Sequence, residues 1–565
     1  MKTKKIAAGV MALALVFGTM AAVPTENGFG FFGGISASAA AETKNWGTNA
    51  EYTIDESTMT VTVSPKEGSD GVLSDKTPFM FNKDIKHVVI SEGITEISDN
   101  AFYMCENLED VELPQSLREI GQSAFKGTKA EKVCKDDNRL NVIGKWIIST
   151  TSESHDDQNA DYVIPAGIKG IAARAFEYAT ISSLTLPESV ETIGKNAFFN
   201  TDLQEINFPN NSEVRIGDYA FHGTKFKELT VPANAILGAG AFYGCTDLKS
   251  VDIVEGVPAI GKSAFADCGN LMKVTIPYSV ESVGEDAFRG TGIVYQQNSE
   301  PFVTVSDWLV AVHDKSESLT VPEGIVGIAD NMGLKGEPKL PKTLRCIGSY
   351  AVKGDGKTEH ETLEIPASVK FISEHAFHDY IAKELVLNEG LEFIGKEAFS
   401  SITDNDITLP ASVEYVECGA FGGLYAQGRS ITVLNPDCVL SCDEPLLPNI
   451  FIPTFVVDRV YGYTGSTAEA LCKAYHDDSK RNDDSEPMLF VPIDGKPDEG
   501  DDTVKGDLNG DGEVNVTDVN LIAAHVKSIR SLGNESLGDV NGDGEVNVSD
   551  LMLVAAHVKG IRPLD

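Results

Sequence analysis

Two segments near the C-terminus place oxygen-bearing residues at the spacing that a calcium ion requires. They are DLNGDGEVNVTD, from Asp507 to Asp518, and DVNGDGEVNVSD, from Asp539 to Asp550, at an offset of thirty-two residues. Each supplies oxygen ligands at positions one, three, five, seven, nine and twelve, with glycine at position six for the sharp turn. The predicted ligands are Asp507, Asn509, Asp511, the Glu513 carbonyl, Asn515 and Asp518, and then Asp539, Asn541, Asp543, the Glu545 carbonyl, Asn547 and Asp550. The sequence therefore predicts two Ca²⁺ ions, one in each loop.

Each loop is followed by a segment with the periodicity of one short amphipathic helix, VNLIAAHVKSIR or LMLVAAHVKGIR. The apolar stripes are Val519, Ile522, Val526 and Ile529 in the first segment, and Leu551, Val554, Val558 and Ile561 in the second. No helix is expected before the first loop, because a charged linker runs directly into Gly506. Each unit is thus a loop followed by one helix, and the two stripes can bury each other.

This duplicated pattern resembles a type I dockerin, the module that attaches enzymes and accessory proteins to cellulosome scaffoldins by binding cohesin domains. The AAHVKS and AAHVKG segments are most similar to those of ruminococcal dockerins. The resemblance implies that calcium is structural, since a module of about sixty residues lacks the core to fold alone. It also implies cohesin contacts at loop positions ten and eleven, which are Val516 and Thr517 in one half and Val548 and Ser549 in the other. The valines argue against clostridial cohesin specificity, where a Ser-Thr pair is usual, and the near-identical halves predict two alternative docking orientations.

The N-terminus has the features of a secretory signal peptide. Lys2, Lys4 and Lys5 precede an apolar run from Ile6 to Phe17, and small residues up to Ala41 offer cleavage sites, so the signal peptide is placed at residues 1–41. The gap between the apolar run and these sites is long, which leaves an uncleaved membrane anchor as the alternative. We predict a secreted, extracellular protein, in a compartment that supplies calcium to the two loops.

Charge and cysteine content narrow the class of protein further. The chain has 85 acidic and 46 basic residues, a net charge of −39 that argues against nucleic acid and anionic membrane surfaces as partners. Nine cysteines are an odd number, so they cannot all pair within the chain. Three of them recur three residues after an Ala-Phe pair, which favours buried free thiols over a disulfide framework: Cys105, Cys245 and Cys268. A single bridge among Cys438, Cys442 and Cys472 stays open.

The region from Asn45 to Pro492 repeats one phrase every twenty-one to twenty-three residues, as in CTDLKSVDIVEGVPAIGKSAF and CGNLMKVTIPYSVESVGEDAF. A period of this length predicts a solenoid whose coils bury their apolar faces only by stacking. The phrase resembles the BspA-like leucine-rich repeat of bacterial surface and secreted proteins that engage host or matrix macromolecules. The predicted fold class is a repeat solenoid with one short strand per coil, followed by a small all-α calcium-binding dockerin. The predicted domains are the signal peptide, the repeats with end caps at 45–493, a linker at 494–505 and the dockerin at 506–565.

Ala-Phe pairs mark the coils, ending at Phe102, Phe125, Phe176, Phe198, Phe221, Phe242, Phe265, Phe288, Phe377, Phe399 and Phe421. The two long gaps contain tryptophan phrases at Trp146 and Trp308, and we expect variant coils there that carry a hairpin. Within a coil, Pro277 ends a short strand, and a glycine such as Gly284 is expected to let the backbone turn tightly. Strands in NWGTNAEYTIDESTMTVTV and a helix opened by the Ser466–Glu469 capping box are the expected end caps.

Stacking would align one outward strand position of every coil into a column. Its members are Val89, Glu112, Val163, Thr185, Asn207, Thr230, Asp252, Thr275, Thr320, Lys339, Glu364, Val386, Thr408 and Thr432. A hydroxyl-bearing surface for an extended ligand is one interpretation, and the other is that threonine simply suits exposed strand positions. Residues just after Ala-Phe pairs make a second row, for which corner packing is the alternative: Tyr103, Phe199, His222 and Tyr243.

We find no nucleophile elbow, HExxH motif or Cys/His signature of catalysis. His375, His378 and Glu374 share one segment, but solvated turn histidines are the commoner case. The sequence thus favours a secreted, non-catalytic binding or adhesion protein of polysaccharide degradation, held by its dockerin on a scaffoldin cohesin. The repeats would bind a polysaccharide or protein. The alternatives are a cryptic glycosidase or peptidase, since dockerins usually accompany hydrolases, and a regulator that binds a protease or another secreted enzyme.

Overall fold

The computed structural model describes residues 42–493 with gaps, of which the longest are 151–159, 423–428, 452–456 and 478–488, and beyond them residues 506, 514, 518–519, 521–523, 538, 540 and 546–558. The chain divides into two compact units, Met1–Glu42 and Thr43–Asp565. The predicted signal peptide and linker lie outside the described residues. None of the helices in the described part of the chain has the length and apolar character needed to span a membrane.

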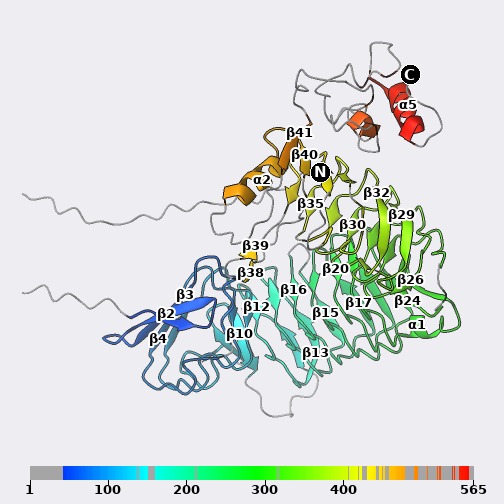
Figure 1. Cartoon of the computed structure of the whole chain (residues 1–565). Helices are drawn as coiled ribbons and strands as arrows, with labels where there is room; N and C mark the ends of the chain where they lie inside the picture. The colour runs from blue at the N-terminus through cyan, green and yellow to red at the C-terminus, as the bar shows by residue number, and fades with distance from the viewer. Residues whose placement is uncertain are drawn as a thin grey trace, which may run out of the picture. The chain divides into compact units, whose positions relative to one another are not determined.

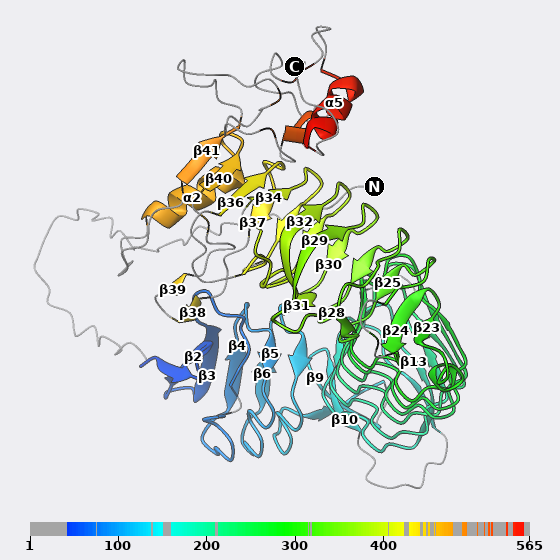
Figure 2. The ribbon, with the colours of Figure 1, turned by 45° about the vertical axis from the view of Figure 1, so that its right-hand side comes forward.

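Most coils of the solenoid contribute a longer strand and, after a tight return, a strand of two residues (Figures 1 and 2). The longer strands are β4 (His87–Ile90), β6 (Asp110–Glu112), β11 (Ala160–Val163), β13 (Ile181–Thr185), β15 (Glu205–Asn207), β17 (Glu228–Val231), β19 (Ser250–Ile253), β21 (Lys273–Thr275), β29 (Glu359–Ile365), β32 (Ile381–Leu387), β34 (Asp406–Leu409) and β36 (Ser430–Val433). The short strands are β5 (Glu96–Ile97), β7 (Glu119–Ile120), β12 (Gly170–Ile171), β14 (Thr192–Ile193), β16 (Arg215–Ile216), β18 (Ile236–Leu237), β20 (Ala259–Ile260), β22 (Ser282–Val283), β25 (Gly327–Ile328), β27 (Cys346–Ile347), β30 (Phe371–Ile372), β33 (Phe393–Ile394), β35 (Tyr415–Val416) and β37 (Val439–Leu440). Successive coils pair in parallel, so the predicted solenoid is confirmed, with a second strand per coil that the repeat pattern did not predict.

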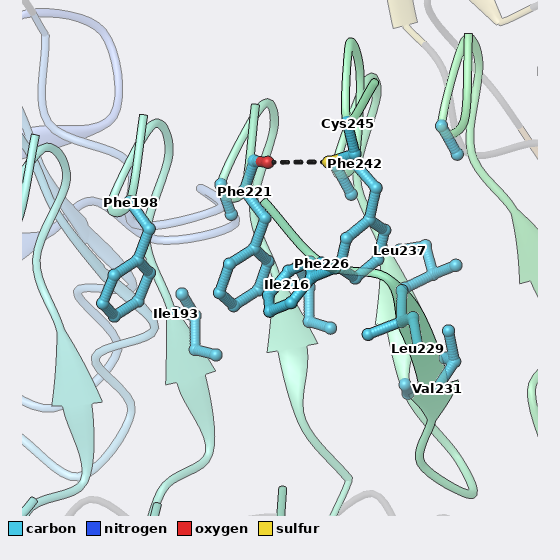
Figure 3. Close-up of a cluster of buried hydrophobic side chains, with 14 of the residues drawn as sticks. Ile193, Phe198, Ile216, Phe221, Phe226, Leu229, Val231, Leu237, Phe242 and Cys245 are labelled. Atoms are coloured by element: carbon cyan, nitrogen blue, oxygen red, sulfur yellow. Dashed lines mark hydrogen bonds between the residues drawn. The ribbon is translucent and has the colours of Figure 1, made fainter. Parts of the chain in front are cut away.

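The interior contains three runs of stacked phenylalanine rings from the Ala-Phe pairs, which end at Phe125, Phe288 and Phe421. Phe198, Phe221 and Phe242 lie with ring centroids 5.1 and 5.3 Å apart and planes within 4° of parallel, as Figure 3 shows. All three rings are fully buried. Large aromatic side chains contribute the most apolar area to such a core, and parallel offset rings pack without loss of contact. A coil is therefore held mainly by its neighbours on both sides.

The predicted thiol ladder is confirmed for the three repeat cysteines. Cys105, Cys245 and Cys268 are free and fully buried. Each Sγ donates to a phenylalanine carbonyl of the preceding coil, at 3.0 Å for Cys105 and at 3.2 Å for Cys245 and Cys268 (Figure 3 draws the Cys245 bond). Burial raises the pKa of Cys105 to about 11, so this thiol is protonated and able to donate. Cys438 and Cys472 are also free, and Cys442 lies outside the described residues.

The glycine that precedes most Ala-Phe pairs, as at Gly261 and Gly284, allows close packing between coils. Gly284 does not have a positive φ, and a Cβ there would lie 2.5 Å from the backbone nitrogen of Lys262 in the preceding coil. Gly261 meets the preceding coil in the same way, with the Gly238 carbonyl oxygen at 2.6 Å. The predicted tight turn does begin at Gly284, whose carbonyl oxygen accepts the Ala287 N–H at 3.2 Å, but it does not use a positive φ. At Gly261 and Gly284 the coils approach more closely than a methyl group allows.

Both long gaps contain the predicted hairpin coils. The antiparallel pairs are β9 (Leu140–Ile143) with β10 (Trp146–Thr150), flanked by β8 (Lys132–Val133), and β23 (Phe302–Val305) with β24 (Trp308–Val312), preceded by α1 (Gly292–Tyr295). Trp146 and Trp308 are buried against Gly170 and Gly327, where a Cβ would lie 2.3 and 2.4 Å from the indole. After the second hairpin, the strands β26 (Leu334–Lys335), β28 (Val352–Lys353) and β31 (Phe377–His378) form a further parallel sheet.

The two ends of the solenoid carry the predicted caps. At the start, β1 (Lys44–Trp46), β2 (Ala50–Asp55) and β3 (Thr60–Pro65) form an antiparallel meander, and the buried Trp46 ring packs edge-on against Phe79 and Phe102 at 5.4 and 5.6 Å. At the end lie β38 (Pro445–Leu447), β39 (Ile450–Phe451), β40 (Arg459–Gly462), α2 (Thr467–Asp477) and β41 (Leu489–Pro492). Ser466 Oγ accepts the Glu469 N–H at 3.3 Å, and the Glu469 carboxylate accepts the N–H of Gly465 at 2.6 Å. The capping box is therefore confirmed, with its return bond shifted by one residue from the usual pattern.

Candidate binding surfaces

The last helix of the chain, α5 (Val548–Val558), begins at the end of the second predicted calcium loop. The backbone N–H of Asn547 donates to the Asp550 carboxylate at 3.0 Å, and the Leu551 N–H donates to the Asn547 carbonyl at 3.2 Å. Asn547 is thus the residue from which the helix starts, and Asp550 reaches back over the first turn as an acidic capping residue does. The hydrogen bond between Asn547 and Asp550 directly links positions nine and twelve of the second loop.

Asp518 and Asp550, which occupy position twelve of the two loops, are fully buried. Among the described residues of the whole chain, they are the only carboxylates so completely removed from water. An ionised carboxylate is costly to bury unless a cation or several hydrogen bonds compensate it. Calcium prefers hard oxygen ligands of this kind, so the two carboxylates fit a calcium site.

The other predicted ligands lie outside the described residues: Asp507, Asn509, Asp511, Glu513, Asn515, Asp539, Asn541, Asp543 and Glu545. So do Val516 and Thr517, while Val548 and Ser549 are the first two residues of α5. Of the predicted stripes, Ile522 and Val554 are fully buried, and Val519, Leu551 and Val558 are half-buried. Leu521, which the stripe did not include, is also buried. Val526, Ile529 and Ile561 lie outside the described side chains.

The predicted outward column exists as a register of paired strand residues. Val89 pairs with Glu112, Thr185 with Asn207, Thr230 with Asp252, Asp252 with Thr275, Thr320 with Lys339, and Glu364 with Val386. Thr408 pairs with Thr432 as expected, but both are buried, 7% and 3% exposed, so the prediction that they face solvent is wrong. The alternation of residues along the strands does not distinguish these two buried threonines from the exposed members of the column.

Carboxylates beside the column accept hydrogen bonds from hydroxyl groups of a neighbouring coil. Asp161 accepts hydrogen bonds from Ser182 at 3.0 Å and Ser183 at 2.7 Å, and these bonds, led by that of Ser183, lower the pKa of the Asp161 carboxyl. Glu384 accepts from Thr362 at 2.7 Å in the same way. This surface is therefore a hydrogen-bonded, acidic and hydroxyl-rich face.

The second predicted row lies at the Ala-Phe corner, and its members are half-buried. Phe199 meets His222 at 4.4 Å and His222 meets Tyr243 at 5.2 Å between ring centroids, with nearly perpendicular planes. Tyr103 contacts Phe81 instead, at 5.5 Å. Both interpretations therefore apply to the same rings. The rings pack at the corner, and each keeps part of its surface exposed to solvent.

His375 and His378 lie at this corner further along the stack, beside Tyr350. His375 pairs with Glu374 at 3.3 Å and with Glu397 at 3.5 Å, and His378 pairs with Asp379 at 3.3 Å. The Tyr350 ring stacks on His375 at 5.0 Å between centroids. Each histidine thus has a carboxylate neighbour, but the side chains are only 18% exposed for His375 and 35% for His378, so the interpretation as solvated turn histidines does not describe His375.

An open hollow of about 500 Å³ lies beside the first hairpin and contains Glu109 and Asp110 in its lining. Each of these carboxylates has a lysine partner, Lys129 at 3.5 Å from Glu109 and Lys132 at 3.8 Å from Asp110. A general acid and base pair instead needs two carboxyl groups whose surroundings drive their pKa values apart. The hollow gives no observation in favour of a hydrolase.

Comparison with known proteins assigns most of the chain. The model of the BspA type leucine rich repeat region matches in six copies, over residues 75–156, 169–294 and 313–427, and the type I dockerin domain matches residues 505–559. No curated protein matches the chain. Among solved structures, a leucine-rich repeat protein from Bacteroides ovatus is 18% identical and covers 79% of this chain and 98% of its own, with a TM-score of 0.21. The pneumococcal vaccine antigen PcpA is also 18% identical and covers 60% and 95%, with a TM-score of 0.27.

Proposed function

The chain belongs to the BspA-type leucine-rich repeat family, and from this premise we propose that it is a secreted, non-catalytic binding component of a cellulosome-type assembly. Its C-terminal module would bind a cohesin domain of a scaffoldin, and its solenoid would present a binding surface to a polysaccharide or protein. The observation that carries the proposal is the pair of fully buried carboxylates, Asp518 and Asp550, inside the region that matches a type I dockerin.

Two calcium ions would hold the dockerin together. Their ligands would be the side chains and carbonyls already named, from Asp507 to Asp518 and from Asp539 to Asp550. Asp518 and Asp550 support this role because each is buried at the residue where a loop passes into a helix. We assign residues 1–41 to a signal peptide, 45–493 to the capped repeats, 494–505 to a linker and 506–565 to the dockerin.

The solenoid supports a binding role through its surface chemistry. Its outward strand column carries hydroxyl or carboxylate groups in successive coils at Thr230, Asp252 and Thr275, and its Ala-Phe corner carries half-exposed rings. Glu109 and Asp110, in the hollow beside the first hairpin, are each paired with a lysine. Regular spacing of polar and aromatic groups suits an extended ligand better than a small substrate.

The test is calcium-dependent binding of the full chain to immobilised type I cohesins, including ruminococcal ones. We expect binding in calcium, loss with a chelator, and recovery when calcium is restored. The variant with both Asp518→Ala and Asp550→Ala should fail to bind, while Asp252→Ala, an exposed carboxylate of the solenoid column, should bind as the parent does. Binding that ignores calcium, or turnover of polysaccharides or proteins by the full chain, would contradict the proposal.

Two docking orientations can be separated with half-specific variants. Val516→Ala with Thr517→Ala alters one half, and Val548→Ala with Ser549→Ala alters the other. We expect each half-variant to keep most of the cohesin affinity and the combined variant to lose it, because the two halves are nearly identical. Loss of binding in one half-variant alone, with the module still folded, would leave a single orientation.

A further inference from the structure

Each coil turns at its Ala-Phe pair between two residues in the left-handed backbone region. One precedes the alanine and the other comes two residues after the phenylalanine. Most coils place asparagine, aspartate, serine or glycine at these positions, as at Asn100, Asn196, Asn200, Gly223, Gly240, Gly244, Ser263, Asp267 and Asp286. These residue types tolerate a positive φ, whereas bulky side chains adopt it at a cost.

Bulkier residues stand at these positions in several coils, namely Met104, Arg174, Tyr178, Tyr219, Tyr350, His375 and Glu397, and two of the tyrosines lie near the centre of the stack. Tyr178 has a φ of 57° and Tyr219 a φ of 53°. Their side chains are 57% and 37% exposed, so burial in the core does not offset the free-energy cost of the positive φ. Unfavourable backbone conformations that persist without a packing reason point to a role for the side chain.

The two tyrosines extend the row formed by Phe199, His222 and Tyr243. Tyr178 meets Phe199 at 5.8 Å, and Tyr219 lies 6.2 Å from His222 and 6.0 Å from Tyr243 between ring centroids. These five rings, from four successive coils, are called the aromatic strip. It lies outside the interior stack of Phe176, Phe198, Phe221 and Phe242, which are all fully buried.

The position of the Tyr219 ring depends on a glycine in the next coil. A Cβ at Gly240 would lie 2.4 Å from the Tyr219 ring, and Gly240 occupies the position where other coils carry Asn100 or Asn196. Burial lowers the pKa of His222, so this ring is neutral at neutral pH and adds apolar surface. The strip is thus a continuous set of uncharged rings, and the glycine at position 240 leaves space for the Tyr219 ring.

Fixed polar groups border the strip at both ends. Tyr243 donates its hydroxyl to Asp267, and Arg289 pairs with Asp267 at 3.5 Å and with Asp286 at 3.3 Å. At the other end, Arg174 and Glu177 pair at 2.6 Å beside Tyr178. Apolar ring surface next to oriented donors and acceptors matches a sugar, which has an apolar C–H face and a rim of hydroxyl groups.

We propose that the aromatic strip binds a neutral polysaccharide chain that runs along the stack of coils. The proposal rests on the binding role given to the solenoid above and names the ligand class. A net charge of −39 disfavours an anionic polymer. The strip is about one ring wide in each coil and lacks the broad buried patch, about 800 Å² per partner, of a stable protein interface.

The test measures binding of the full chain to three soluble probes: hydroxyethyl cellulose, arabinoxylan and anionic polygalacturonate. Affinity electrophoresis and calorimetry should detect at least one neutral probe and no binding to polygalacturonate. The variant with Tyr178→Asn and Tyr219→Asn introduces the residue type that Asn200 and Asn196 provide at the same positions, so it is expected to fold. Its affinity for the neutral probe should fall by about tenfold, which corresponds to about 1.4 kcal/mol.

Two further variants test whether the loss of affinity comes from the aromatic strip. Gly240→Asn keeps every ring but displaces that of Tyr219, and we expect weaker binding from it as well. Tyr295→Ala removes a tyrosine that is 74% exposed and lies outside the strip, and should change nothing. Failure of the parent chain to bind either neutral probe, equal binding by the double variant, or capture of a protein through the strip would overturn the proposal. Cohesin binding should be the same in all variants, which separates this outcome from failure of the dockerin assignment.

Discussion

The solenoid and the C-terminal module differ in what they remove from water. Within the described residues of the solenoid, the fully buried side chains are apolar apart from hydroxyls, the Asn196 amide and the Arg345 guanidinium, and no carboxylate is among them. The far smaller described part of the C-terminal module buries Asp518 and Asp550 completely. Packing between coils can therefore sustain the first region, whereas in the second region hydrogen bonds or a cation must compensate the buried carboxylates.

This contrast explains how one chain can combine a rigid surface with a conditional attachment. The ring stack of the solenoid contains no ionisable group that a change in metal concentration would affect. Metal binding to the C-terminal loops, by contrast, would be part of the folding free energy of the module. We expect conditions that release the module to leave the solenoid intact.

Calcium removal should have the largest effect. With a chelator in excess, we expect the C-terminal module to unfold and cohesin binding to disappear, while the unfolding transition of the solenoid stays where it was. Calorimetry of the full chain in calcium and in chelator measures both transitions. A shift of both unfolding transitions on calcium removal would contradict the proposed difference between the two regions.

Phe221→Ala should damage the solenoid and spare the module. Phe221 is fully buried between Phe198 and Phe242, and truncating such a ring costs about 3–5 kcal/mol. Denaturant unfolding measures the loss, and calcium-dependent cohesin binding under native conditions should be retained. Tyr295→Ala, at an exposed tyrosine, is the matched control.

Gly261→Ala should have a moderate effect through the spacing between coils. The added methyl group would meet the Gly238 carbonyl oxygen at 2.6 Å, and overpacking of this kind costs about 1–3 kcal/mol. Gly269→Ala introduces a methyl group with nothing within 4 Å and should change the unfolding free energy little. Equal stability of the two variants would refute the close-approach explanation of the repeat glycine.

Asp330→Asn should give the smallest effect, and one that depends on pH. Burial raises the pKa of Asp330 above its ordinary 3.8, against the opposing hydrogen bond from the Ser349 N–H. A raised folded-state pKa means that the stability contribution is present at low pH and is lost as pH rises through that value. The amide introduced by this substitution would remain neutral and can still accept the Ser349 N–H, so the variant should be slightly more stable than the parent at neutral pH. Denaturant unfolding from neutral pH down to below 3.8 should show this advantage disappear.

Much of the solenoid could be predicted from its sequence, because each repeated residue type occupies one kind of structural position. The Ala-Phe spacing predicts the coils and the buried ring stack, and the tryptophans at Trp146 and Trp308 predict the hairpins. The repeat thiols were predicted as buried and free, and Ser466 as a helix cap. In each case a local pattern carries the information.

The parts that sequence did not predict depend on contacts between distant residues. The sequence predicts the turn at Gly284 but not the close approach to Lys262 that favours glycine there. Thr408 and Thr432 have the alternation of exposed residues and yet are buried. Tyr178 and Tyr219 were missed in the second row, although tyrosine at positions that other coils give to asparagine or glycine was a signal. All of the calcium ligands stay predictions, and of them the structure describes only Asn547, Asp518 and Asp550.

Hydrogen exchange of the full chain, compared in chelator, in calcium, and in calcium with a type I cohesin, tests the central claim most directly. We predict that residues 506–565 gain protection with calcium and gain more with cohesin, while the coils from 45 to 493 exchange alike in all three states. Protection of the coils by cohesin, or a C-terminal module equally protected without calcium, would contradict the account.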